Sequence, residues 1–196
     1  MRRNVILAGV GGQGLLAVAA IIGQAATRLG LCVKQAEVHG MAQRGGVVQS
    51  HLRFADAPIH SPLVSEGTAH LILSLEPMEA LRYLPFLALD GAIVVSSAPF
   101  VNIPDYPDLA GVVDALDATG RAHTMNAETL AADAGARQAA NIVMLGAGTP
   151  YLGIAKTALV EEVGRFFAAK GAKVIETNRR AFHAGLAAIR ASTADT

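Results

Sequence analysis

The sequence predicts an α/β fold, with helices on both faces of a mostly parallel, mixed β-sheet in a three-layer, Rossmann-like arrangement. Two observations carry this prediction. Short apolar runs alternate with longer segments rich in alanine and leucine through the first half of the chain, and strands and helices alternate in this way in α/β proteins. The C-terminal third is a succession of helix-forming segments, and we expect it to cover one face of the sheet.

The first half of the chain contains the expected strand–helix–strand unit. Residues 4–8 form a short apolar run, and residues 15–29 are rich in Ala, Leu and Ile with few helix breakers. Gly30 is typical of the position after a helix end, and residues 31–38 are the expected second strand. Apolar and polar residues then alternate from 47 to 54, which predicts a half-exposed strand that is antiparallel or lies at an edge.

Two apolar runs in the middle of the chain, at 69–75 and 92–96, predict further strands on either side of a helix at 79–87. Prolines between residues 97 and 111 predict an extended loop. Residues 121–125 are expected to form a short strand. The helices expected around it are 127–133, 138–145, 155–169 and 178–191.

A few residues are expected to shape the ends of these helices. Gly146 and Gly148 are expected to interrupt the chain after the helix at 138–145. Asn178 is expected to cap the last helix. Asn141 is expected to cap a helix or to form a hydrogen bond near the loops.

Composition limits the classes of function. The chain has 196 residues, of which 52% are hydrophobic, and this is enough for one core, so we expect a single domain over residues 1–196. Lys+Arg and Asp+Glu are equal at 16 each, which argues against nucleic acid or an anionic membrane as a partner. No apolar run approaches the roughly 18 residues of a membrane span. We therefore expect no membrane association and a cytoplasmic location.

The cysteine and histidine content argues against redox centres and metal sites within the chain. Cys32 is the only cysteine, so the chain cannot form an internal disulfide or hold an iron–sulfur cluster, which takes about four thiolates. Six histidines are scattered without the spacing of metal ligands. We expect no metal site and no catalytic residues in this chain alone.

A glycine-rich loop follows the first strand and opens the first helix. Residues 9–14 read GVGGQG, which fits the pattern GxGxxG of phosphate-binding loops. Glycine permits a positive φ and a close approach of phosphate to the backbone, and the helix N-terminus favours an anion. The predicted guest is a diphosphate, and the alternative is close strand–helix packing alone. The candidate binding residues are Gly9, Gly11, Gly12, Gln13 and Gly14.

A second loop, HGMAQRGG at residues 39–46, places a single arginine among glycines. The planar guanidinium of Arg44 suits a phosphate or a carboxylate. Either a ligand phosphate or a carboxylate of another subunit fits, and the alternative is a turn with a surface arginine. The candidate binding residues in this loop are His39, Gly40, Arg44, Gly45 and Gly46.

Taken together, GVGGQG, EVHGMAQRGG and SHLRF resemble the gamma-type domain of the 2-oxoacid:ferredoxin oxidoreductases, and most of all the small (beta) subunit of the indolepyruvate type. The resemblance extends over nearly the whole chain. Its later segments are SLEPMEALRYLPFL (74–87), PFVNIPDYPD (99–108), NIVMLGA (141–147) and ETNRRAFHAG (176–185).

The resemblance implies a function that the chain performs only within a complex. Such enzymes decarboxylate a 2-oxoacid on thiamine diphosphate, pass electrons through iron–sulfur clusters to ferredoxin, and transfer the acyl group to coenzyme A. The gamma-type domain contributes to coenzyme A binding and docks on the large subunit. Thiamine diphosphate, Mg and the iron–sulfur clusters are then expected on that partner only. The indolepyruvate type implies an aryl pyruvate as substrate.

Three alternatives remain at this point. The chain resembles, less closely, a gamma subunit of a pyruvate or 2-oxoglutarate enzyme. GxGxxG alone would also fit a stand-alone nicotinamide- or flavin-dependent oxidoreductase. Such a site needs a lone acid at the end of the second strand. Glu37 lies near that position, but the second loop follows it directly, so it is not such an acid. The last alternative is a non-catalytic assembly subunit that binds no ligand.

Overall fold

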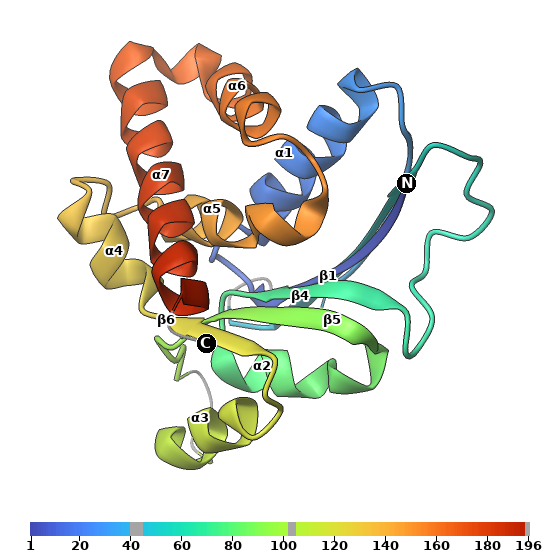
Figure 1. Ribbon diagram of the computed structural model, residues 1–196. Helices are drawn as coiled ribbons and strands as arrows, with labels where there is room; N and C mark the ends of the chain where they lie inside the picture. Colours follow the sequence, from blue (N-terminus) through green and yellow to red (C-terminus); the bar gives the residue numbers. More distant parts are fainter. Residues whose placement is uncertain (40–44, 102–104, 195–196) are drawn as a thin grey trace.

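Six strands form one mixed sheet in the computed structural model, which describes residues 1–39, 45–101 and 105–194 (Figure 1). Their bounds are Arg2–Val10 (β1), Cys32–His39 (β2), Val47–Ala55 (β3), Ala69–Ser74 (β4), Leu87–Ser96 (β5) and Ala122–Met125 (β6). The order across the sheet is β2-β3-β1-β4-β5-β6. β1, β4, β5 and β6 run parallel, whereas β3 is antiparallel to both of its neighbours, β1 and β2.

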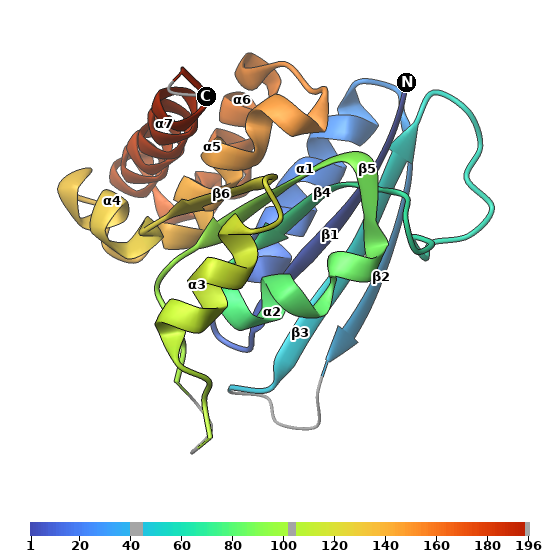
Figure 2. The same cartoon turned by 60° about the horizontal axis from the view of Figure 1, so that its bottom comes forward.

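Helices cover both faces of this sheet, which confirms the three-layer α/β prediction. Their bounds are Leu15–Arg28 (α1), Pro77–Arg82 (α2), Leu109–Asp117 (α3), Ala127–Asp133 (α4), Ala140–Leu152 (α5), Lys156–Phe166 (α6) and Ala172–Ala194 (α7), with 3-10 turns at Leu84–Phe86 (η1) and Ala168–Lys170 (η2). α1 and α4 to α7 pack on one face, and α2 and α3 on the other (Figures 1 and 2). The C-terminal third thus covers one face, as expected.

β1 lies in the interior of the molecule, and both of its faces are buried. Val5 and Leu7 belong to the larger apolar cluster, beneath α1 and α5, whereas Ile6 and Ala8 belong to the smaller cluster on the other face. Side chains of a strand alternate between faces, so an uninterrupted apolar run is required here. This is the pattern of a parallel strand between two helical layers.

Two predictions about helix ends were wrong, and close helix packing explains the first. Gly146 and Gly148 both lie inside α5 rather than after it, and α7 crosses α5 at Gly146. A Cβ on Gly146 would lie 2.0 Å from the carbonyl oxygen of Phe182, and one on Gly185 would lie 1.8 Å from that of Val143. Glycine at both positions lets the two backbones touch.

The second wrong prediction concerns Asn178. It lies within α7, which begins at Ala172, and its Nδ2 donates to the carbonyl oxygen of Val174 at 2.8 Å. The strand expected at 47–54 is antiparallel, as predicted, but it is not half-exposed. β2 takes the edge position, and His51 of β3 is only 5% exposed.

Acidification is expected to destabilise the fold through two histidines. Nδ1 of His51 accepts the backbone N–H of Val64 at 3.0 Å, and Nδ1 of His70 accepts that of Asn4 at 3.1 Å. Burial lowers the pKa of both side chains, and nearby Arg3 lowers the pKa of His70 further. The unfolded chain takes up these protons near pH 6.5. Stability should therefore be complete above about pH 6.5 and decline below it.

Urea denaturation at pH 7.5 and 5.5 measures this effect. The double variant His51→Gln/His70→Gln should show a smaller pH dependence than the natural protein. Burial raises the pKa of Glu79, which acts in the opposite sense at more acidic pH, but it does so in both proteins. Identical pH dependence of the two would contradict the prediction.

Candidate ligand-binding cleft

β1 and β4 form the topological switch point of the sheet. They are adjacent and parallel, with Ala8 opposite Ser74 at their carboxyl ends. The chain leaves β1 into α1 on one face and leaves β4 into α2 on the other (Figure 2). The connections diverge at such a point, and α/β proteins bind ligands in the resulting crevice.

A cleft of about 630 Å³ opens at this switch point. The glycine-rich loop forms one wall, the residues after β4 and β5 form the floor, and the segment from α4 to α5 forms the opposite wall. The lining residues are Gly11, Gly12, Gln13, Leu75, Ser96, Phe100, Ala127, Glu128, Ala132, Arg137, Gln138, Ala140 and Asn141.

Gly11, Gly12 and Gln13 of the glycine-rich loop line this cleft, and the loop contains backbone donors without partners. Gly12 has a φ of 103° and Gly14 a φ of 77°, values that favour glycine strongly. Neither of their N–H groups has a hydrogen-bond partner among the described residues, and no side chain caps the N-terminus of α1. Free N–H groups at the positive end of a helix are the usual elements of an anion site.

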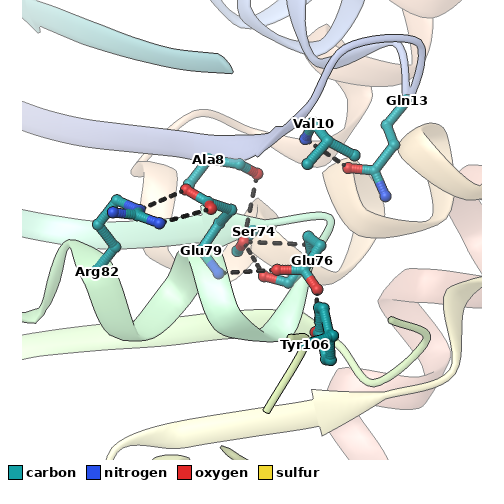
Figure 3. A network of polar contacts seen from close by, with 8 residues as sticks. All are labelled: Ala8, Val10, Gln13, Ser74, Glu76, Glu79, Arg82 and Tyr106. Carbon is teal, nitrogen blue, oxygen red and sulfur yellow. Dashed lines mark hydrogen bonds and ion pairs between the residues drawn. The ribbon is translucent and has the colours of Figure 1, made fainter. Parts of the chain in front are cut away.

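Gln13 and Gly9 shape the loop. Oε1 of Gln13 accepts the N–H of Val10 at 2.9 Å (Figure 3). Nε2 of Gln13 donates to the carbonyl oxygen of Leu75 at 3.0 Å. A Cβ on Gly9 would lie 2.7 Å from Oε1 of Gln13, so only glycine leaves room for this arrangement. Gln13 thereby ties the end of β1 to the chain that follows β4. Direct ligand contacts by these two residues stay a prediction.

The two glycine-rich loops singled out in the sequence meet in the fold. The N–H of Gly11 donates to the carbonyl oxygen of Gly46 at 2.8 Å, and the N–H of Gly45 donates to that of Gly11 at 3.3 Å. The antiparallel pairing of β1 with β3, which sets Val10 opposite Val47, brings them together. Gly45 has a φ of 74°, so a glycine is favoured here too.

Part of the second loop lies outside the described residues. This applies to Gly40 and Arg44 and to the side chain of His39, whose backbone ends β2. The partner of Arg44 therefore stays a prediction.

A buried polar network, which no sequence pattern indicated, supports the same end of the sheet (Figure 3). The carboxylate of Glu76 accepts the N–H of Glu79 at 2.8 Å and the hydroxyl of Tyr106. Oγ of Ser74 donates to the carbonyl oxygen of Glu76 at 2.6 Å.

Burial raises the pKa of Glu79, and its contact with Arg82 opposes this shift. Burial and the bond to Glu76 also raise the pKa of Tyr106. Tyr106 is thereby joined to Glu76, the N-cap residue of α2.

The segment from α4 to α5 contributes polar groups that sequence reasoning largely missed. Nδ2 of Asn141 donates to the carbonyl oxygen of Gly14 at 3.1 Å, which confirms a hydrogen bond to the loops. Arg137 adds a cation to the lining, and Glu128 an acid. The NIVMLGA segment marked Asn141 only, and nothing in the sequence marked Arg137.

Metal and membrane features are absent from the part of the chain that the structure describes. No group of three or more His, Cys, Asp or Glu side chains lies close enough to hold a metal ion there. None of the described helices combines the length and apolarity of a membrane span.

The fold and cleft define an α/β protein with a glycine-rich loop at its switch point, a class that includes many nucleotide-binding proteins. Comparison with known proteins narrows this class. The family model for pyruvate ferredoxin/flavodoxin oxidoreductases matches residues 4–188. The chain belongs to this family.

Individual relatives agree with this assignment. The chain is 40% identical over 153 residues to indolepyruvate oxidoreductase subunit IorB of Archaeoglobus fulgidus, which covers 74% of this chain and 75% of that protein. The gamma subunit of a keto/oxoacid ferredoxin oxidoreductase from Geobacter sulfurreducens PCA has a similar structure, with a TM-score of 0.74 and 25% identity, over 97% of this chain and 98% of that one.

A third similarity concerns the fold alone. The 2-oxoglutarate:ferredoxin oxidoreductase from Magnetococcus marinus, solved with 2-oxoglutarate, coenzyme A and succinyl-CoA bound, superposes with a TM-score of 0.76 at 20% identity. The match covers 97% of this chain and 31% of that chain. The fold described here thus corresponds to one part of a larger polypeptide in that enzyme.

Proposed function

We propose that the chain is the small subunit of an indolepyruvate-type 2-oxoacid:ferredoxin oxidoreductase. The complex would convert an aryl pyruvate, coenzyme A and oxidised ferredoxin into an acyl-CoA, carbon dioxide and reduced ferredoxin. The observation that carries the proposal is the 40% identity to an indolepyruvate oxidoreductase subunit, against 28% to a 2-oxoglutarate synthase subunit, KorC of Methanothermobacter thermautotrophicus.

The role of this chain in that reaction is to bind coenzyme A. The N–H groups of Gly12 and Gly14 would donate to the diphosphate at the start of α1, and Asn141 would hold the loop in place through Gly14. The coenzyme A bound to the Magnetococcus marinus enzyme supports this choice of ligand. Arg44 would add a charged contact, either to a phosphate or to a carboxylate of the large subunit.

The remaining chemistry belongs to the partner. Cys32, the only cysteine, cannot supply the thiolates of an iron–sulfur cluster. The clusters, Mg and thiamine diphosphate would therefore lie on the large subunit, which would also pass electrons to ferredoxin. A cytoplasmic location accords with such a complex.

Co-expression with the large subunit of such an enzyme tests the proposal. The two chains should co-purify, and the complex should reduce a viologen dye with indolepyruvate in a reaction that depends on coenzyme A. This chain alone should be colourless and inactive. Preference for pyruvate or 2-oxoglutarate would assign the chain to another branch of the family. Turnover by the purified chain with a nicotinamide or flavin cofactor would reject the proposal.

A further inference from the structure

A second hollow borders the glycine-rich loop, and the loop separates it from the switch-point cleft. It has a volume of about 310 Å³, and Gly11 and Gly12 line both spaces. The apolar side chains that line it are those of Val10, Leu15, Leu16 and Val48. Val48 belongs to β3, whereas the floor of the cleft follows β4 and β5, and these strands lie on opposite sides of β1. We call this space the Leu16 hollow.

The chemistry of the lining favours an apolar occupant. None of the described residues that line the Leu16 hollow has an ionisable or polar side chain. A phosphate or a carboxylate would therefore find no side-chain counter-charge there, and removing an unpaired charge from water is costly. An aryl pyruvate carries such a carboxylate, so an uncharged apolar group fits the hollow better than the substrate does.

Leu16 is an apolar residue on the outer surface of α1. The exposed positions near the other end of this helix are polar, at Gln24, Thr27 and Arg28. Beside the glycine-rich loop the exposed position is Leu16 instead, with an exposed fraction of 40%. The solvent-facing stripe of a surface helix is normally polar. The exception on α1 is therefore confined to the end that forms the hollow.

The proposed reaction determines which molecule covers this surface. The acyl group would form on the thiamine diphosphate of the large subunit, and the thiol of coenzyme A must reach it from the cleft. The large subunit must then face the mouth of the cleft. Apolar side chains are exposed on that side of the loop as well, because Phe100 lines the cleft and Val101 follows it. Exposed apolar surface beside a binding cleft is typical of a protein interface.

We propose that the Leu16 hollow receives an apolar side chain of the large subunit, which packs against Leu16. The inference rests on the proposed function and extends it, because it gives the glycine-rich loop a second role. One side of the loop would hold coenzyme A, and the other side would hold the subunit that carries the acyl group. A few apolar anchors buried in pockets contribute most of the affinity of many interfaces.

Leu16→Asp tests this inference through the affinity of the two purified subunits, measured without coenzyme A. A carboxylate forced into an apolar contact should weaken assembly by about ten- to a hundredfold. The fold should tolerate the change, because the first turn of α1 contains no acidic residue and an acid is stabilising there. The melting temperature of the isolated variant checks this point. Leu16→Lys should weaken assembly similarly, whereas Leu16→Met should keep the affinity within about threefold.

Leu89→Asp is the matched control. Leu89 is 98% exposed, but it lies near the start of β5, at the opposite end of the sheet from the cleft. This variant should assemble with unchanged affinity. Unchanged assembly of Leu16→Asp, or equal weakening by Leu16→Asp and Leu89→Asp, would overturn the inference. Self-association of the isolated chain that Leu16→Asp abolishes would also overturn it, since a second copy would then occupy the hollow.

The same measurements distinguish this inference from the proposed function. If the natural chain assembles and Leu16→Asp assembles equally well, the inference alone fails. A complex that shows the expected loss with Leu16→Asp but does not oxidise an aryl pyruvate supports the inference and contradicts the proposed function. A natural chain that does not bind the large subunit would reject both.

Discussion

Gly185→Ala is expected to lower the free energy of unfolding by about 3 kcal/mol, which corresponds to a fall in melting temperature of roughly 6–12 °C. The added Cβ would lie 1.8 Å from the carbonyl oxygen of Val143. This neighbour is backbone within α5, so it cannot turn aside as a side chain would. α5 and α7 would have to separate, and the core between them would lose contacts along its length. Thermal and urea denaturation of the purified chain measure the effect.

Gly23→Ala is the matched control within α1. A Cβ there meets only Leu52 and Val33 side-chain atoms, each at 3.8 Å, which is ordinary contact. Alanine favours the helix more than glycine does, so this variant should gain about 0.5–1 kcal/mol. If both variants were equally stable, the close crossing of α5 and α7 would be wrong.

Gly12→Val is expected to raise the Michaelis constant for coenzyme A by about ten- to a hundredfold in the assembled complex. The side chain would stand in open space at the mouth of the cleft, in front of the N–H groups that we assign to the diphosphate. Each charge-assisted hydrogen bond lost is worth roughly 1.5–3 kcal/mol, and about 1.4 kcal/mol corresponds to tenfold in affinity. The measurement is steady-state dye reduction at varied coenzyme A.

Gly67→Val separates loss of the site from backbone strain. Gly67 also has a positive φ, of 69°, and open space around its Cβ position, but it precedes β4, at the opposite end of the sheet from the cleft. Both variants should lose some stability from the strained φ. Only Gly12→Val should change the coenzyme A constant, and an equal change in both would remove the glycine-rich loop from the ligand site.

The fold class was predictable because it depends on local patterns. The apolar run of β1, the glycines after it and the following helix are contiguous in sequence, and they define one unit of a parallel sheet. The position of β3 was not predictable to the same extent. Its alternation indicated an antiparallel strand, but the insertion of β3 between β1 and β2 is a long-range pairing that no local pattern encodes.

The candidate site, like the fold, was only partly predictable from the sequence. The glycine-rich loops were visible because a positive φ restricts the residue type at Gly12, Gly14 and Gly45. Their contact through Gly11 and Gly46 follows from strand pairing and was not visible. Arg137 was not recognisable in the sequence, since its place in the cleft depends on how the α4–α5 segment packs opposite the glycine-rich loop.

Hydrogen–deuterium exchange of the assembled complex, with and without coenzyme A, most directly tests the claim that this chain holds the coenzyme A-side cleft. Coenzyme A should slow exchange in peptides spanning residues 9–16, because the N–H groups of Gly12 and Gly14 would gain partners that they lack among the described residues. Peptides spanning 132–141 should also be protected, since they form the opposite wall. Protection confined to the large subunit, with exchange in this chain unchanged, would contradict the account.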